Sequence, residues 1–323
     1  MAKHFKSYLA PQLSQFIAYR KNLGYASKTL FSHLKTFDRY VAEKKIDEAI
    51  LQPAFFLEMR ATLKIEPASI NSLFYSLSAF FQFLLRKGYY FENPIQDIPP
   101  LPQSAFIPFI FSSGQTDQLL AAICKRIRKT PRYYLKDLAE YMAVLLLSRC
   151  GLRIKEPLRL KLNHYRSRER TIYIEKTKFK KDRLIPVPHS VAKQIENYLA
   201  ARNALLIEDQ NPHLLVSNNQ KGLIDNRVRL VFHRAVKDIG LDRPRQVLGN
   251  TIFSSPTPHS LRHSFAVNTL KAVRKRGQSP QNALPVLAVY MGHSEYKHTI
   301  KYLKVIDAEH RHSLLKASQK EGL

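Results

Sequence analysis

The chain has 323 residues, 45% hydrophobic and 24% charged, which is typical of a globular protein and sufficient for two domains. Its 52 Lys and Arg against 25 Asp and Glu give a formal net charge of +27, spread along the whole chain, and this favours a polyanion such as nucleic acid as partner. No apolar run approaches a membrane span, and MAKHFKSYLA lacks the apolar core of a secretory signal. We therefore expect a cytoplasmic protein in which Cys124 and Cys150, too few for a disulfide framework, are buried.

Residues 1–98 are predicted to form a helical domain. Apolar side chains recur at helical spacing in four segments, which are residues 11–23, 27–41, 53–63 and 68–87. The fourth segment is rich in aromatic residues, and their helical spacing indicates core positions and not a platform for stacking bases. Basic residues on the opposite faces normally form only a solvated surface. With this net charge, Lys28 and Lys35 are candidate contacts to nucleic-acid phosphates.

A proline-rich stretch follows the helical domain. It contains Pro94, Pro99, Pro100, Pro102 and Pro108. Proline cannot continue a helix and favours a semi-rigid extended chain. We therefore predict a linker over residues 99–112 and a second domain over residues 113–323.

The second domain is predicted to be helical with one β-hairpin. Helices are expected over residues 115–128, 135–150, 190–206 and 226–239, and a loop over residues 241–258. Gly151 permits a turn, and Arg153 and Glu156 follow it three residues apart, which alone would indicate a salt bridge. Residues 171–174 and 182–187 are the predicted strands of the hairpin. Lysines crowd its tip: Lys176, Lys178, Lys180 and Lys181.

The stretch from His259 to Tyr302 contains the groups most suited to chemistry. His259 and Arg262 stand three apart in a segment with helical spacing, so both side chains share one face. His293 follows a glycine, and Tyr302 lies in a further short helical stretch. A guanidinium, two imidazoles and a phenol suit an anionic phosphorus centre better than a carbonyl or a metal. His310 and His312 could suggest a metal site, but they lack Cys or carboxylate partners at ligand spacing, so we expect them to be surface residues.

Four motifs occur in order along the second domain: GLRIKE, TKFKKDRLIPV, HSLRHSFA and MGHSEYKHTIKYL. Together they strongly resemble the catalytic domain of the tyrosine recombinase (phage integrase) family. Residues 1–98 are similar to the helical core-binding domain of that family, and FIAYRKNLGY and LKTFDRYV are similar to its transposon-associated members. The resemblance implies a mainly α fold with a small β-hairpin sheet, in which two domains clamp double-stranded DNA.

The resemblance also implies roles for individual residues. Arg153 and Arg262 match the catalytic arginines, His259 and His293 the histidines, Lys178 the hairpin lysine that acts as general acid, Tyr302 the nucleophile, and Glu156 the supporting acidic residue. Because a tyrosine hydroxyl has a pKa of about 10, it needs electrostatic help or a base at neutral pH, and His259 is the candidate proton acceptor. Lys176 and Lys180 are alternatives for the lysine, although the spacing to Arg183 and Pro186 favours Lys178. Further DNA contacts are expected from Lys176, Lys180, Lys181, Arg183, Lys28 and Lys35.

By this resemblance the protein is a nucleoid-associated, site-specific recombinase that serves integration, excision or transposition through a 3′-phosphotyrosyl intermediate. It needs no cofactor and works as a tetramer on DNA, with accessory proteins as further partners. The rival functions are a type IB topoisomerase and a DNA-binding architectural protein that has lost activity; the occupied catalytic positions argue against the latter. A helix expected over residues 307–319 packs on its own domain or docks on a neighbouring protomer.

Overall fold

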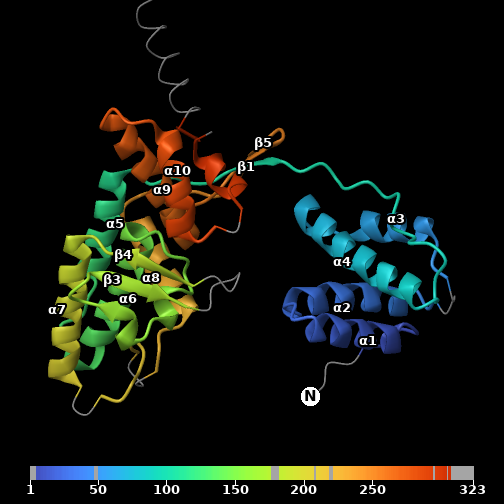
Figure 1. Ribbon diagram of the computed structural model, residues 1–323, viewed down its shortest axis with the longest axis horizontal. Coiled ribbons are helices and arrows are strands. Elements are labelled where there is room, and N and C mark those ends of the chain that lie inside the picture. Colours follow the sequence, from blue (N-terminus) through green and yellow to red (C-terminus); the bar gives the residue numbers. More distant parts are fainter. Residues whose placement is uncertain are drawn as a thin grey trace, which may run out of the picture. The chain divides into compact units, whose positions relative to one another are not determined.

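The computed structural model describes residues 5–46, 50–175, 182–206, 209–217, 221–293, 295–303 and 305–306. The chain forms two compact units, Met1–Ser104 and Ala105–Leu323 (Figure 1). The boundary between the units falls inside the proline-rich segment 99–112. The predicted fold class, mainly helical with a small sheet, is confirmed.

The first unit consists of helices joined by short turns. They are α1 (Ala10–Asn22), α2 (Lys28–Glu43), α3 (Pro53–Thr62) and α4 (Pro67–Arg86), within a residue or two of the predicted segments. A proline stands in the first turn of α1, α3 and α4. Proline suits this position because the first helical N–H groups have no partner within the helix and its fixed φ is already helical.

Aromatic rings fill the core of the first unit, as the helical spacing predicts. Phe37 contacts Phe56 and Phe81, with ring centroids 6.1 and 5.9 Å apart, and all three side chains are buried. Among the described helices, α4 has the length and apolar composition of a membrane span, contrary to our expectation. Half of its apolar stretch is buried, because Leu77 and Phe80 belong to the core of this unit.

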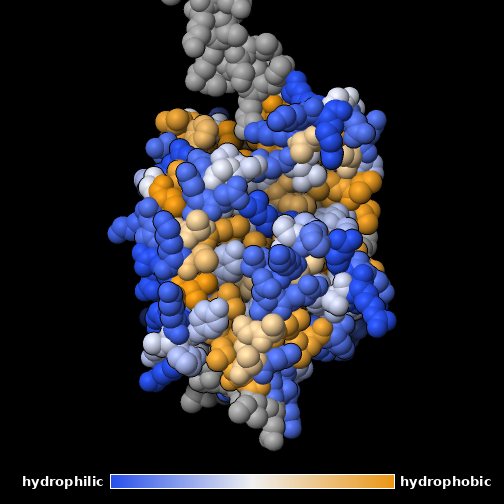
Figure 2. Space-filling view, turned by 90° about the vertical axis from the view of Figure 1, so that its left-hand side faces the viewer, coloured by the Kyte–Doolittle hydropathy of each residue, from blue (hydrophilic) through white to orange (hydrophobic). Residues whose placement is uncertain are grey.

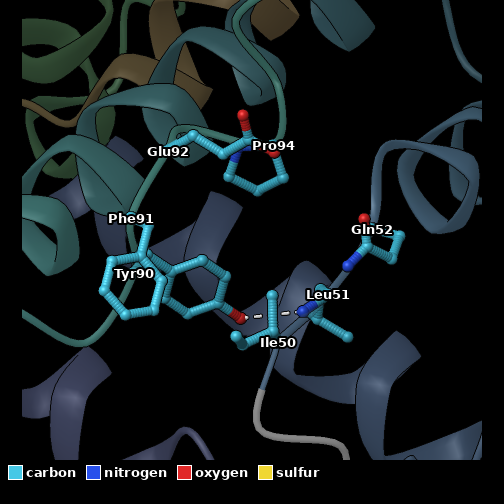
Figure 3. Close-up of a pocket in the computed structure, with 7 residues that line it drawn as sticks. All are labelled: Ile50, Leu51, Gln52, Tyr90, Phe91, Glu92 and Pro94. Atoms are coloured by element: carbon cyan, nitrogen blue, oxygen red, sulfur yellow. Dashed lines mark hydrogen bonds between the residues drawn. The ribbon is translucent and has the colours of Figure 1, made fainter.

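The segment that precedes α3 is held against the chain that follows α4. The Tyr90 hydroxyl accepts a hydrogen bond from the Leu51 amide at 3.0 Å, drawn as a dashed line in Figure 3. A pocket of about 270 Å³ lies beside this contact, lined in part by Gln52, Phe91 and Pro94. Tyr90 thus links the two ends of the α3–α4 hairpin.

The second unit is built around α6 (Pro131–Arg149). Its apolar run, including Val144, Leu145, Leu146 and Leu147, is buried. The helices that pack against α6 are α5 (Ser113–Lys125), α7 (His189–Leu205), α8 (Asp225–Asp238) and α9 (Pro258–Lys275) (Figure 1). Helix α10 (Pro280–Met291) packs on α9. The prediction of a buried central helix is confirmed.

The predicted hairpin is also present, in a three-stranded antiparallel sheet. Its strands are β2 (Tyr165–Arg166), β3 (Thr171–Ile174) and β4 (Arg183–Pro186), in the order β2-β3-β4. Ile172, Ile174 and Ile185 point into the core and are buried. Two short 3-10 turns, Pro157–Arg159 and Leu162–His164, connect α6 to this sheet. The lysine-rich tip, residues 176–181, lies outside the described residues.

The loop predicted over residues 241–258 is in part a second sheet, so that prediction was wrong. β5 (Gln246–Leu248) and β6 (Thr251–Phe253) form a hairpin, and β1 (Ala105–Ile107) pairs in parallel with β6. Strands of three residues are too short to show a clear alternation. The strand β1, which lies inside the segment predicted as the linker, is thereby fixed to the chain that leads into α9.

The two cysteines differ in their exposure to solvent. Cys150 is buried at the end of α6, as expected, whereas Cys124 on α5 is exposed. The prediction for Cys124 was wrong because its position lies on the solvent side of the helix, next to Lys125.

The face drawn in Figure 2 is covered mainly by hydrophilic residues with scattered apolar ones, as is usual for a protein surface.

Gly151 is the residue on which the approach of α9 to α6 depends. It follows α6 with a φ of +59°, and a Cβ at this position would lie 2.4 Å from Cδ1 of Phe265 on α9. We expect Gly151→Ala to reduce the free energy of unfolding by about 2–4 kcal/mol, because a left-handed conformation and an overpacked contact each cost about 1–3 kcal/mol. Chemical denaturation would measure this loss.

Gly114→Ala is the matched control. Gly114 lies in the first turn of α5, its φ is not positive, and a Cβ there would meet no atom within 4 Å. This substitution should leave the stability unchanged or raise it by less than about 1 kcal/mol. Equal effects of the two substitutions would contradict the role assigned to Gly151.

Candidate active site

The start of α9 places three of the functional side chains. Thr257 caps the helix by accepting from the Ser260 amide at 3.3 Å, and Pro258 occupies the first turn. His259 and His263 therefore lie one turn apart, with Arg262 beside them. The unpaired N–H groups and positive dipole end of a helix N-terminus favour a bound anion.

Arg262 is almost completely buried, with 1% of its surface exposed. Its guanidinium donates to the carbonyl of Gly151 at 2.7 Å and to that of Met291 at 2.5 Å. These bonds use two of its five N–H donors and fix the plane of the group. Burial, with the nearby charge of Arg153, lowers the pKa of Arg262 to about 9, so it remains charged at neutral pH.

The C-terminal end of α10 binds three arginines. The carbonyls of Tyr290, Met291 and Gly292 accept hydrogen bonds from Arg183, Arg262 and Arg153, respectively. Carbonyls in the last turn of a helix have no partner within the helix and carry the negative end of its dipole. The helix end therefore gathers guanidiniums from the turn after α6, from β4 and from α9.

Glu156 provides the counter-charge for two of these arginines. Its carboxylate accepts from Arg153 at 2.9 Å and from Arg183 at 2.8 and 3.1 Å. The salt bridge predicted between Arg153 and Glu156 is thus confirmed. Burial alone would raise the pKa of Glu156, but the hydrogen bonds and charge of Arg183 outweigh burial, and the pKa is lowered.

Arg183, which we predicted to contact DNA, is engaged inside the protein. Its side chain is 7% exposed, and its guanidinium is bonded to Glu156 and to the Tyr290 carbonyl. We predicted a DNA contact because Arg183 follows a lysine-rich hairpin tip. In the structure it ties strand β4 to Glu156 and to the end of α10.

Tyr302 lies in a helical stretch, residues 297–303, as predicted. It is 4% exposed, and its hydroxyl forms a hydrogen bond of 3.1 Å with Nδ1 of His263. Burial raises the pKa of Tyr302, while the positive charges of Arg262 and Arg153 oppose this rise. The phenol is therefore protonated at neutral pH.

The other two histidines flank this pair. Nδ1 of His293 lies 2.8 Å from the Thr299 hydroxyl, and its ring stacks on Tyr302 at 6.2 Å between centroids. The ring of His259 meets that of His263 edge-on at 4.5 Å. Burial and the cationic Arg262 lower the pKa of His293 to about 3 and that of His259 to about 4. His259 is the most solvent-exposed of the three, and solvent screening weakens the effect there.

The structure thus brings together the predicted catalytic and supporting residues except Lys178. The charges of Arg153 and Arg262 act on Tyr302, and the His293 ring stacks on it. His259 contacts His263, and Glu156 contacts Arg153. Lys176, Lys178, Lys180 and Lys181 lie outside the described residues, as do His310, His312 and the helix expected over residues 307–319. Lys28 and Lys35 are exposed on α2, two turns apart, in the first unit.

His263, whose side chain forms a hydrogen bond with the Tyr302 hydroxyl, was not among the residues predicted for the site. It is printed in HSLRHSFA, directly after Arg262 and one turn from His259. Its spacing of four residues from His259 predicts that the two share a helix face. That spacing could have marked it as a candidate.

The arrangement suits a single anionic centre and a single nucleophile. Two fixed guanidiniums, of Arg153 and Arg262, can hold nonbridging phosphate oxygens, because arginine presents several N–H donors in a planar fork. The uncharged histidines add hydrogen-bonding groups without adding charge. No group of three or more His, Cys, Asp or Glu side chains placed to hold a metal occurs in the part of the chain that the structure describes.

The comparison with known proteins identifies the family. The phage integrase family matches residues 111–309. The putative integrase/recombinase y4rE of Sinorhizobium fredii is 28% identical, over 93% of this chain and 92% of the relative. Tyrosine recombinase XerA of Pyrococcus furiosus is 25% identical, over 96% of this chain and 95% of the relative.

The fold of the chain is similar to that of a solved integrase structure. A crystal structure of a lambda integrase tetramer bound to a Holliday junction has a TM-score of 0.63 and 16% identity, over 89% of this chain and 77% of that chain. The chain belongs to the phage integrase family and is a tyrosine recombinase.

Replacing Glu156 tests the electrostatic frame of this site. Because the pKa of Glu156 is lowered in the folded state, its contribution to stability is complete above its unfolded pKa, near 4.5, and is lost as the pH falls through the lower folded value. We expect Glu156→Gln to reduce the free energy of unfolding by about 3–5 kcal/mol at pH 7, since it leaves buried arginines without their partner. The deficit should shrink toward pH 3 in denaturation experiments.

An exposed carboxylate gives the control. Glu169 pairs with Arg166 on the surface, where both side chains are more than half exposed. Glu169→Gln should change stability by less than about 1 kcal/mol at any pH. A Glu156→Gln deficit that does not depend on pH would contradict the ionic role of Glu156.

Proposed function

We propose that this tyrosine recombinase acts on double-stranded DNA as a site-specific recombinase, and that Tyr302 forms the covalent 3′-phosphotyrosyl link. The observation that supports this most is the position of the Tyr302 hydroxyl, buried beside His263 and in the field of Arg153 and Arg262. A phenol in a cationic site is suited to attack a phosphodiester and to remain as a stable ester.

Arg153 and Arg262 bind the scissile phosphate. Negative charge develops on its nonbridging oxygens during displacement, and prepositioned guanidiniums stabilise that charge without further reorganisation. Hydrogen bonds to the end of α10 hold both groups in place before DNA arrives. His259 and His293 donate hydrogen bonds to the same phosphate from either side of the nucleophile. Glu156 keeps Arg153 in position.

Lys178 protonates the departing 5′ oxygen. An alkoxide is a poor leaving group at neutral pH, so a general acid must donate a proton as the P–O bond breaks. Lys178 lies in the sequence between strands β3 and β4, and Arg183 at the start of β4 anchors the paired strands to Glu156. The products are a 3′-phosphotyrosine and a free 5′ hydroxyl. The ester conserves the energy of the original bond for rejoining.

The net charge of +27 supports a DNA substrate, since neutralising phosphates releases counterions. Lys28 and Lys35 in the helical first unit, which acts as the core-binding domain, contact the DNA backbone, as do Lys176, Lys180 and Lys181. By analogy with the lambda integrase tetramer on a Holliday junction, four protomers assemble on two DNA sites. We place the protein in the cytoplasm with the nucleoid, where it serves integration, excision or transposition together with accessory proteins.

Trapping the covalent intermediate tests the proposal. Nicked suicide duplexes of randomised sequence, incubated with the full chain, should yield an adduct that survives denaturant, and sequencing of the trapped DNA should give one preferred site. Tyr302→Phe should abolish the adduct and leave the Kd for DNA within about twofold, because only the hydroxyl is lost.

The remaining outcomes separate the rival functions. Adducts on arbitrary DNA, with relaxation of supercoils but no strand exchange, would indicate a type IB topoisomerase. DNA binding without any adduct would indicate an architectural protein. An adduct in the Tyr302→Phe variant would contradict the assignment of the nucleophile.

A further inference from the structure

His263 is placed against the reacting atom of the site. Its Nδ1 lies 3.1 Å from the Tyr302 hydroxyl, and the two rings are 5.7 Å apart between centroids. Among the described residues, His263 is the hydrogen-bond partner of the Tyr302 hydroxyl. The ring of His259, the proton acceptor expected from the sequence, lies 4.5 Å from the His263 ring between centroids. The order of groups is therefore Tyr302, His263, His259, from the interior toward the more exposed imidazole.

We propose that His263, and not His259, is the immediate proton acceptor for Tyr302 during strand cleavage. This inference rests on the proposed function of the site. The phenol O–H bond breaks as its oxygen bonds to phosphorus, and the proton passes to Nδ1 of His263. The P–O5′ bond breaks, and the leaving 5′ oxygen takes a proton from Lys178. Rejoining reverses both transfers, so the His263 imidazolium returns its proton to the tyrosyl oxygen.

The protonation state of His263 suits this role. Burial, together with His259, Arg262, His293 and Lys301, lowers the pKa of His263 to about 3, so the ring is neutral at physiological pH. Because its Nδ1 is the atom nearest the hydroxyl, a neutral ring that carries its proton on Nε2 accepts from the phenol. These groups come from α9, from the turn after α10 and from the stretch that carries Tyr302.

Binding of DNA strengthens His263 as a base. A phosphodiester held by Arg153 and Arg262 places negative charge beside these cations. The repulsion that keeps the imidazole unprotonated is then reduced, and its pKa rises toward the ordinary value. Proton transfer also becomes easier during the attack itself, since the phenol proton becomes more acidic as its oxygen bonds to phosphorus. The base is thus weak in the free protein and competent once the substrate is in place.

The test uses the full chain and a nicked suicide duplex that the wild-type protein has been shown to cleave. His263→Gln retains a side chain that can accept a hydrogen bond from the tyrosine but cannot take up its proton. His233→Gln, at an exposed histidine on α8, is the matched control. The rate of adduct formation is measured between pH 6 and 9, with a normal substrate and with one whose 5′ bridging oxygen is replaced by sulfur.

We expect His263→Gln to slow adduct formation about 10²–10³-fold at pH 7, within the range of general base catalysis, with the Kd for DNA within twofold of wild type. The variant rate should rise about tenfold per pH unit, since it depends on the small fraction of free tyrosinate, whereas the wild-type rate should be nearly flat. The sulfur leaving group, which needs no general acid, should rescue Lys178→Ala but not His263→Gln. His233→Gln should behave as wild type.

Several results would overturn the inference. One is a His263→Gln rate within about threefold of wild type; another is a loss that is the same at every pH, which would indicate a positioning role only. Rescue by the sulfur substrate would assign His263 to the leaving group instead. These outcomes leave the proposed function intact, because the wild-type adduct persists. Failure of the wild-type protein to form an adduct on any duplex in the randomised pool would instead refute the proposed function, and this inference with it.

Discussion

Three consecutive carbonyls at the end of α10 bind three arginines, and the active site depends on this contact more than on any other. Tyr290, Met291 and Gly292 accept from guanidiniums that arrive from three separate parts of the second unit. Gathering three cations in one place is unfavourable in itself, because like charges repel. The carbonyls and the negative end of the helix dipole offset part of this repulsion, and the Glu156 carboxylate offsets more. Two of the three, Arg153 and Arg262, are the arginines that we propose bind the phosphate.

The buried ionic cluster formed by Glu156 and these arginines also joins separate elements of the second unit. Breaking a buried pair leaves an uncompensated charge, so the cluster holds together the turn after α6, strand β4, and helices α9 and α10 as one unit. The same helix end leads directly to His293, whose ring stacks on Tyr302. The electrostatic centre and the nucleophile are therefore positioned by one element. Gly292 permits this, since it closes α10 with a φ of +63° and a Cβ there would lie 3.0 Å from the Arg183 guanidinium.

The sequence predicted the helices well because their apolar spacing is local information. In α4, residues such as Phe74, Leu77 and Phe81 recur every three to four positions, and all are buried. The strands β1 and β6 could not be predicted in this way. Each has three residues, and Ala105 of β1 pairs with Thr251, far along the chain. Such a pairing is set by tertiary packing and leaves no periodic pattern.

The site residues likewise divide into those that could be predicted from the sequence and those whose contacts depend on tertiary packing. Motif order identified Arg153, Arg262, His293 and Tyr302, since resemblance to a family carries tertiary information that spacing does not. The contacts of Arg183 could not be predicted from its neighbours in the sequence. A basic residue beside a lysine-rich segment resembles a DNA contact, yet Arg183 is buried against Glu156 and the end of α10. His263 was visible in its motif. Its contact with Tyr302, however, joins residues 39 positions apart and depends on the packing of α9 against the C-terminal stretch.

The central claim is that this electrostatic centre serves one nucleophile, Tyr302. The most direct measurement is to digest the trapped protein–DNA adduct with protease and nuclease and to locate the attached 3′-phosphonucleotide by mass spectrometry. The account predicts that the peptide containing Tyr302 carries it. The modification on Tyr296, which is 45% exposed and six residues away, or on Tyr290 would contradict the account.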